Sequence, residues 1–263
     1  MMPVEGGPFL RLSGLGELAG VSHFISTRGG GGLDPPRLNL AFGLADSGAT
    51  VVANRRHLFG ALGVDPGRVA LVRQVHGRSV VVVAEGQHDG LAPPDRLTAA
   101  DAMVTTSPGL WLAVLVADCV PVLAADPVRG AVGIAHAGWR GTVAGVTGAL
   151  LGALTDKCGC RLQDLRVAIG PSIGPDDYEV GAPVARRFAA AFPEDAGVVR
   201  RARRGRYLVD LWQANAHQAR AAGVPARNIE VAGISTAGAL DLFFSHRVEG
   251  LAAGRFAAGV ALC

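Results

Sequence analysis

The stretch that decides the fold runs from residue 109 to residue 141 and reads GLWLAVLVADCVPVLAADPVRGAVGIAHAGWRG. Its three apolar runs predict buried strands at 109–117, 121–125 and 131–135. After a turn that contains glycine, the apolar residues of 141–154 recur near helical spacing and predict a helix. Cys119 and His136 stand where two of the strands end, and such strand ends are where α/β proteins place their sites.

Strand and helix patterns alternate along the rest of the chain. They predict strands at 69–72, 79–83 and 165–169, a last strand region around Phe243 and Phe244, and helices at 182–191 and 210–222, the latter capped by Asp210. No internal repeat or long linker divides the chain, so we expect one continuous domain over residues 1–263. The pattern indicates an α+β (mixed α/β) fold with more strand than a simple βαβ protein.

Composition narrows the classes of protein to which the chain can belong. Its 263 residues are 49% hydrophobic and 18% charged, with a net charge of +3, which argues against a nucleic-acid binder. The longest apolar stretch, residues 110–117, is too short to cross a membrane. Residues 1–20 lack the basic segment and apolar run of a signal peptide, so we expect a cytoplasmic, reducing setting.

Two local clusters have ordinary interpretations. Residues 200–206 read RRARRGR, which favours a solvated hairpin turn, with a site for an anionic partner as the alternative. Cys158 and Cys160 have no histidine or cysteine partner nearby in the sequence, so we interpret them as thiols near a helix end, and Cys263 as incidental.

Three polar residues are candidate metal ligands, namely His76, Cys119 and His136. Imidazole nitrogen and thiolate sulfur together suit Zn²⁺, and three protein ligands leave a fourth position open, as in catalytic sites. Two alternatives remain open. The residues can be structural, since a lone buried cysteine is usually a small hydrophobe. Cys119 and one histidine can also form a nucleophilic pair that needs no metal.

The segments that contain these residues resemble one family closely. Residues 73–77 (RQVHG), 117–123 (ADCVPVL) and 136–141 (HAGWRG) are similar to segments of the YfiH-type laccase-domain family. Further matching pieces cover nearly the whole chain, at 26–30, 38–40, 54–55, 101–105, 169–175, 178–181 and 243–247.

The resemblance implies a fold, a metal and an activity. It implies a single-domain sandwich of mixed sheets flanked by helices, and a zinc site of His76, Cys119 and His136. It implies phosphorolysis of adenosine, inosine and methylthioadenosine, with adenosine deamination beside it. Alternatives attached to the family are a cytosolic hydrolase that edits peptidoglycan precursors and a copper-dependent polyphenol oxidase. The sequence departs from the family pattern at Asp177 and Ser235, where cysteines are common.

We expect the substrates to be a purine nucleoside and phosphate, bound by a monomer. Arginine suits phosphate, so Arg28, Arg73 and Arg140 are candidate phosphate ligands, although each can instead hold a loop through backbone carbonyls.

The remaining polar candidates each carry two interpretations. Asn39 can bind a base edge or hold a turn. Beside the ligand Cys119, Asp118 is a candidate catalytic residue that orients a histidine, or a structural hydrogen-bond acceptor. Trp139 can stack on a purine or pack in the core.

Overall fold

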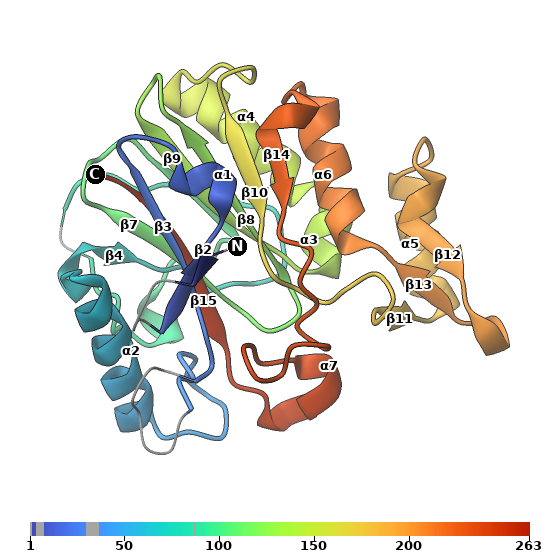
Figure 1. Ribbon diagram of the computed structural model, residues 1–263, viewed down its shortest axis with the longest axis horizontal. Coiled ribbons are helices and arrows are strands. Elements are labelled where there is room, and N and C mark those ends of the chain that lie inside the picture. Colours follow the sequence, from blue (N-terminus) through green and yellow to red (C-terminus); the bar gives the residue numbers. More distant parts are fainter. Residues whose placement is uncertain (1, 4–7, 30–36, 87) are drawn as a thin grey trace.

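The computed structural model describes residues 2–3, 8–29, 37–86 and 88–263. Within them the chain forms three sheets and seven α-helices (Figure 1). The helices are α1 (Ser13–Gly16), α2 (Gly48–Leu62), α3 (Trp139–Ala144), α4 (Val146–Cys158), α5 (Ala182–Ala191), α6 (Leu211–Ala222) and α7 (His246–Glu249). None of these helices has both the length and the apolar character that crossing a membrane requires.

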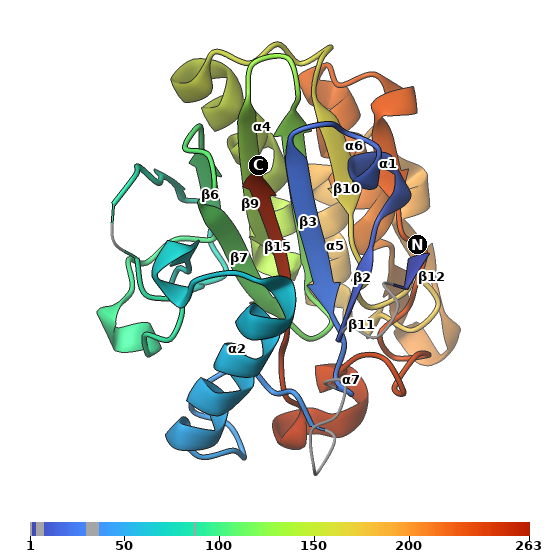
Figure 2. The ribbon, with the colours of Figure 1, turned by 60° about the vertical axis from the view of Figure 1, so that its left-hand side comes forward.

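The first sheet has six strands and contains the first and the last strand of the described chain. In spatial order they are β1 (Met2–Pro3), β2 (Phe9–Arg11), β3 (Val21–Ser26), β15 (Phe256–Leu262), β7 (Trp111–Val116) and β4 (Val69–Ala70). All neighbours are antiparallel except β4 and β7. The last strand therefore lies in the middle of the sheet, beside the early strand β3 (Figure 2).

The second sheet also has six strands. In spatial order they are β14 (Ile229–Val231), β10 (Arg166–Ile169), β8 (Val120–Asp126), β9 (Ala131–Ala137), β6 (Ala102–Thr105) and β5 (Val80–Val82). The central strands β8 and β9 form an antiparallel hairpin that pairs Pro121 with His136. They are completely buried, which explains why the sequence reads there as continuous apolar runs rather than as an alternation.

The two large sheets pack face to face, and helices cover their outer faces. Leu112 and Val114 of β7 meet Leu123 of β8 and Ile134 of β9 in the core between the sheets. Successive strand residues point to opposite faces, so Val122 and Ala124 of β8 instead pack under α4 and α6. On the other side α2 covers the outer face of the first sheet. The fold is the mixed α/β sandwich that the sequence and the resemblance predicted.

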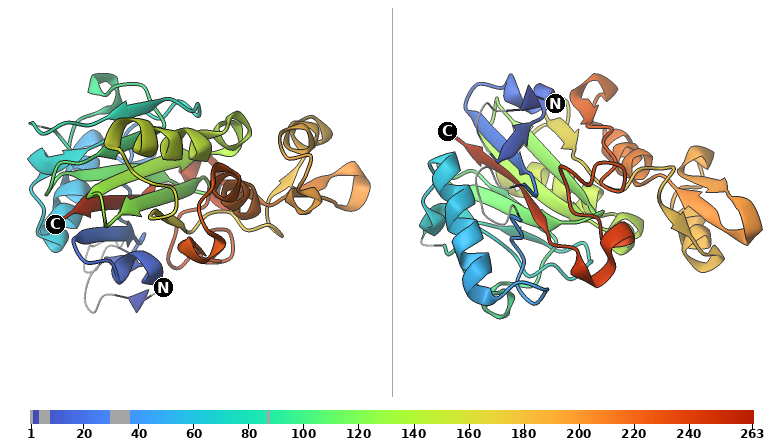
Figure 3. Two further views of the ribbon diagram at one scale, coloured as in Figure 1. Left: turned by 90° about the horizontal axis from the view of Figure 1, so that it is seen from above. Right: turned by 60° about the horizontal axis from the view of Figure 1, so that its bottom comes forward.

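A third, three-stranded sheet projects beside α6 (Figure 3). Its order is β11 (Glu179–Val180), β13 (Tyr207–Val209) and β12 (Val199–Arg201), and α5 packs against it. The predicted arginine-rich turn joins β12 to β13 as a hairpin. Arg200 and Arg206 form ion pairs with Asp176 and Glu179.

Several predicted elements need correction. The helix expected at 141–154 is two helices, because Gly145 adopts a φ of +86° between α3 and α4. The strand regions at 69–72 and 79–83 belong to different sheets, as β4 and β5. Phe243 and Phe244 lie in a turn, where both side chains are buried, and the last strand is β15. Helix α2 was not predicted.

Buried His23 on β3 is expected to make the stability of the fold depend on pH. Its Nε2 accepts the backbone N–H of Leu12, and its Nδ1 has no partner among the described residues. Burial, together with the nearby Arg11, lowers the pKa of His23 from 6.5 to about 4. In the unfolded chain His23 is therefore protonated below about pH 6.5, whereas in the folded chain it stays neutral until about pH 4. The contribution of His23 to the free energy of unfolding therefore falls as the pH falls through this window, by about 2 kcal/mol between pH 7 and pH 5.

The variant His23→Gln keeps an acceptor for Leu12 but does not titrate. We expect its free energy of unfolding, measured with urea at pH 7 and pH 5, to lack this loss. An equal loss in the variant and the wild type would contradict the role of His23.

Candidate metal centre

Three segments from different parts of the chain converge on one point. His76 lies in the turn after β4, Cys119 immediately before β8, and His136 inside β9, one residue beyond the predicted strand end. Their potential ligand atoms, two imidazole nitrogens and one sulfur, all lie within 4.8 Å of one another. The hairpin of β8 and β9 brings Cys119 and His136 together, and the loop before β5 adds His76.

Asp101 holds the two histidines in place. Its Oδ1 accepts the backbone N–H of His76 at 2.9 Å and bonds Nδ1 of His136 at 2.9 Å, while its Oδ2 accepts the N–H of Gly77 at 2.6 Å. His76 needs this support because its φ of +59° is unfavourable for a residue with a side chain. Asp101 is fully buried. Sequence reasoning missed this role, although Asp101 begins one of the segments that match the family.

Asp118 has a different role from the predicted one. It lies in the turn between β7 and β8 with a φ of +79°, not in a strand. Its carboxylate accepts the hydroxyl of Thr236 at 2.7 Å and the backbone N–H of Arg247 at 2.6 Å. The prediction that Asp118 orients a histidine is therefore wrong, since Asp101 makes that contact. Asp118 is the structural acceptor of the alternative interpretation, and it fixes the turn that presents Cys119.

The cluster favours an ionised thiol. Burial of Cys119 opposes ionisation, but the charge of His136 and hydrogen bonds from both histidines outweigh it and lower the thiol pKa to about 6. Burial also favours neutral His136, yet Cys119 and Asp101 raise the pKa of its imidazole to about 9. The pair thus holds a proton that a metal ion would displace on binding.

The donor set fits a zinc ion. Two nitrogens and a thiolate are ligands that zinc takes, and a tetrahedral ion separates its ligands by roughly 3.5 Å, a scale that this cluster approaches. The second nitrogen of His136 is held by a carboxylate, as is usual for a metal-bound histidine. His76 is exposed and Cys119 is half-buried, so a bound ion would keep an open side toward solvent.

Gly138 leaves room for the cluster. A Cβ at this position would lie 2.9 Å from Cδ2 of His76 and 3.0 Å from Sγ of Cys119. We expect Gly138→Ala to push two of the three ligands apart and to weaken zinc binding by at least about 10-fold, on the scale of an overpacked core. Its φ of −70° suits alanine, so the backbone is not strained.

The matched control is Gly152→Ala in α4, where a Cβ meets nothing within 4 Å. Competition with a chromogenic zinc chelator measures both affinities. Equal affinity in the two variants would contradict the crowding argument.

Two cavities meet at the cluster. The first, of about 390 Å³, is lined by Arg55, Arg73 and Arg255 together with all three candidate ligands. The second, of about 330 Å³, is lined by Trp139, Arg140, Tyr178 and Arg247, and shares His76 and Cys119 with the first. A substrate that spans both cavities would place its middle beside the cluster.

Among the predicted phosphate ligands, Arg73 and Arg140 reach these cavities and Arg28 does not. Arg28 donates to the carbonyl of Leu240 at 3.0 Å and pairs with Glu249 at 2.9 Å. It holds a loop, as the alternative interpretation stated. Trp139 is half-buried against the core, and the guanidinium of Arg140 lies 4.5 Å from the centre of its ring.

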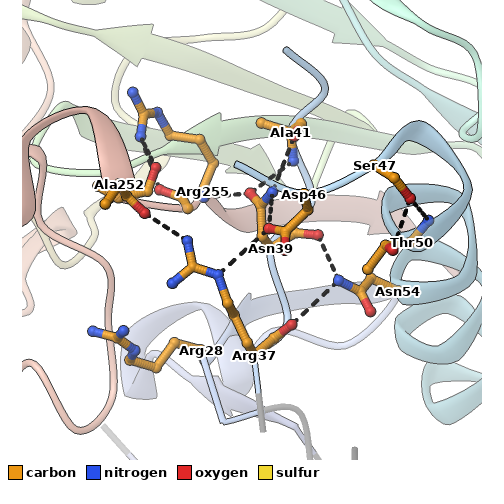
Figure 4. Close-up of polar contacts among 12 residues, drawn as sticks. Arg28, Arg37, Asn39, Ala41, Asp46, Ser47, Thr50, Asn54, Ala252 and Arg255 are labelled. Atoms are coloured by element: carbon orange, nitrogen blue, oxygen red, sulfur yellow. Dashed lines mark hydrogen bonds and ion pairs between the residues drawn. The ribbon is translucent and has the colours of Figure 1, made fainter. Parts of the chain in front are cut away.

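Asn39 is fully buried, and both ends of its amide are occupied (Figure 4). Its nitrogen donates to Asp46 at 2.7 Å and to the carbonyl of Ala41 at 3.1 Å. Its oxygen accepts the backbone N–H groups of Ala41 and Arg255. These contacts leave no group free for a base, so the structure supports the loop-holding alternative.

The two departures from the family pattern touch each other. The hydroxyl of Ser235 donates to the carboxylate of Asp177 and accepts the backbone N–H of Gly174. They form one polar contact in the loop next to Tyr178, which lines the second cavity.

Comparison with known proteins agrees with this fold and identifies the family. A family model described as multi-copper polyphenol oxidoreductase laccase matches residues 22–263. A purine nucleoside phosphorylase of Bacteroides thetaiotaomicron is 32% identical over 251 residues, 94% of this chain and 93% of that protein. The purine nucleoside phosphorylase YlmD of Geobacillus stearothermophilus is 36% identical over 93% of this chain and 91% of that protein. An adenosine deaminase, RL5, from an unknown prokaryotic organism is 35% identical over 93% of this chain and 95% of that protein.

The structure of this chain is also similar to a solved structure of a relative. The crystal structure of YlmD from Geobacillus stearothermophilus superimposes with a TM-score of 0.91 at 33% identity, over 99% of this chain and 98% of that one. The sequence segments, the sandwich and the match over almost the full length agree, and this chain therefore belongs to the YfiH-type laccase-domain family.

Proposed function

We propose that this protein is a zinc-dependent purine nucleoside phosphorylase that cleaves adenosine, inosine and methylthioadenosine. The observation that carries the proposal is the meeting of two cavities at His76, Cys119 and His136. Relatives that cover almost the whole chain and are named purine nucleoside phosphorylase support it.

The reaction needs an anion, a nucleoside and a means of helping the base to leave. An oxygen of phosphate attacks C1′ of the ribose, the bond from C1′ to the base breaks, and the base takes up a proton. The cationic side chains of Arg73 and Arg140 line the two cavities and would orient the phosphate and the sugar. Zinc bound by the cluster would supply Lewis acidity at the point where the cavities meet.

Adenosine deamination is a second candidate activity. It is favoured by the relative that is named an adenosine deaminase and covers 93% of this chain. Water replaces the amino group of adenine and ammonia leaves, so this reaction consumes no phosphate. The same cluster would serve it, with the adenine ring rather than the ribose placed beside it.

Two rival functions are a multicopper oxidase, which the residues fit less well, and a cysteine hydrolase. A multicopper oxidase needs a type-1 copper and a trinuclear cluster with many histidines, whereas the chain has seven histidines. Within the described ranges, three ligand-type side chains gather at one point. A hydrolase that acts on peptidoglycan precursors would use Cys119 as the nucleophile and His136 as the base, with no need for metal.

The test is release of base from adenosine and inosine by protein of known metal content, with and without phosphate. We expect base release that requires phosphate, follows about one zinc per chain, and disappears after the metal is removed with a chelator and returns with zinc. Base release that persists without metal would contradict the zinc dependence that the proposal includes. No turnover of any purine riboside by fully zinc-loaded protein would overturn the proposal.

A further inference from the structure

The first cavity is unusually rich in positive charge. Arg55, Arg73 and Arg255 line it, and none of its described lining residues is an aspartate or a glutamate. No ion pair holds any of the three arginines within the described part of the chain. The cavity thus concentrates three guanidinium charges beside the metal cluster, and among its described lining residues the Cys119 thiolate is the single anion.

Arg55 is the most buried of the three, with 2% of its surface exposed. Its guanidinium donates to three backbone carbonyls, of Leu40 at 2.8 Å, Gly90 at 3.0 Å and Ala92 at 3.1 Å. Burial lowers the pKa of its side chain to about 10. The carbonyls fix the group in position without neutralising it, because carbonyls carry no net charge, and Asp89, whose charge partly offsets the effect of burial on Arg55, does not line this cavity. A buried charge of this kind is costly unless an anion compensates it.

Arg255 is a second fixed cation in the lining of this cavity. Its Nη1 donates to the carbonyls of Ala253 and Gly254, at 2.9 and 2.8 Å, while no hydrogen bond of its Nε or Nη2 is found among the described residues. Its backbone N–H is fixed at 2.8 Å by buried Asn39, and Figure 4 shows how Asn39 is in turn held by Asp46. The remaining N–H groups, on Nε and Nη2, can donate to an anion in the cavity. The hydrogen bonds from Nη1 and from the backbone N–H hold Arg255 in position.

The second cavity has another character. It is lined by Asp118, and its arginines lie over its aromatic rings, with Arg140 at 4.5 Å from the Trp139 ring centre and Arg247 at 5.1 Å from that of Tyr178. A carboxylate repels phosphate, whereas flat π surfaces stack on a purine. The first cavity therefore suits the phosphate anion, and the second suits the uncharged nucleoside.

We propose that the first cavity is the subsite for inorganic phosphate, with Arg255 and Arg73 as its ligands and Arg55 as a fixed charge behind them. The purine then occupies the second cavity, and the ribose C1′ lies between the two, at the cluster. This assignment rests on the proposed phosphorylase function. The assignment makes Arg73 a phosphate ligand and Arg140 a residue of the nucleoside cavity, whereas the sequence analysis named both as candidate phosphate ligands.

The experiment compares Michaelis constants for phosphate and for adenosine in single variants of zinc-loaded protein. Loss of one charge-assisted hydrogen bond raises the phosphate KM in Arg255→Met by about 10- to 100-fold, with a much smaller change in the adenosine KM. Arg255→Lys, which retains the charge, recovers part of the loss. Arg140→Met mainly raises the adenosine KM. The matched control is Arg161→Met, an exposed arginine outside both cavities, which changes neither constant.

The reverse pattern, with the phosphate KM raised in Arg140→Met but not in Arg255→Met, would overturn the assignment. If the wild type shows no phosphorolysis, the proposed function fails, and the subsite is then tested alone by calorimetric titration of the protein with inorganic phosphate. Binding that is lost in Arg255→Met and kept in Arg161→Met supports the subsite. Equal binding by both variants, or none by the wild type, rejects it.

Discussion

Replacing Cys119 with alanine is expected to remove both the metal and the activity. Cys119 is the single anionic donor of the cluster, and its thiol pKa of about 6 keeps it ionised at neutral pH. Two neutral imidazoles alone hold zinc weakly, and a bound metal ion contributes several kcal/mol to stabilising a transition state. We therefore expect base release to fall by about 1,000-fold or more. Atomic absorption after dialysis measures the metal, and release of hypoxanthine from inosine measures the activity.

The matched control is Cys263→Ala, which removes an exposed thiol and is expected to change neither quantity. A second variant, Cys119→Asp, tests the role of a ligand, since a carboxylate is an anionic donor that can bind zinc in place of the thiolate. Retained zinc with measurable turnover in Cys119→Asp supports the role of a ligand. If Cys119→Ala kept its full zinc content but lost all activity, Cys119 would be the nucleophile and the metal interpretation would be wrong.

The second large effect is expected at Asp101, which never touches the metal. Asp101→Asn keeps the shape but turns one acceptor oxygen into a donor nitrogen. If that nitrogen replaces Oδ2, it faces the N–H of Gly77, and if it replaces Oδ1, it faces the N–H of His76 and Nδ1 of His136. In either case a hydrogen-bond acceptor is lost. We expect zinc affinity to fall by about 10- to 100-fold, as for other carboxylates that orient a ligand histidine. The unsatisfied buried groups also cost about 1–3 kcal/mol of folding free energy.

Asp126→Asn is the control that separates these two effects. Asp126 is also buried, and it accepts the backbone N–H groups of Val128 and Arg129 in the turn between β8 and β9, away from the cluster. Its variant should lose stability in urea while zinc affinity in chelator competition stays unchanged. Similar losses of zinc affinity in both variants would mean that Asp101 acts only through general stability.

Much of the central fold could be predicted from local pattern. The runs at 109–117, 121–125 and 131–135 became β7, β8 and β9 because a strand that is buried on both faces needs apolar residues throughout. Asp210 caps α6 as predicted, since its carboxylate accepts the N–H of Gln213. Helix α2 was missed because its apolar residues show little helical periodicity, and β15 because alanine and glycine, which dominate it, have low strand propensity.

The candidate cluster could be suggested by the sequence, but its supporting contacts could not. His76, Cys119 and His136 stood out as ligand types near strand ends, and the resemblance grouped them. Asp101 begins a segment that matches the family, but its contact with His136 could not be predicted, because a hydrogen bond between residues 35 positions apart leaves no local pattern. For the same reason Asp118 was given a contact with a histidine that its positive φ and its bonds to Thr236 and Arg247 exclude.

By itself the sequence determined the elements of the central sheet, the donor types of the cluster and the family. These follow from side-chain chemistry and from periodicities that lie within a few residues. Tertiary structure alone decided which carboxylate supports the histidines, that Arg28 and Asn39 hold loops, and that Arg255 joins Arg73 in one cavity while Arg140 faces another. Those outcomes depend on how two sheets pack face to face and so bring distant segments together, and no local pattern of residues encodes that packing.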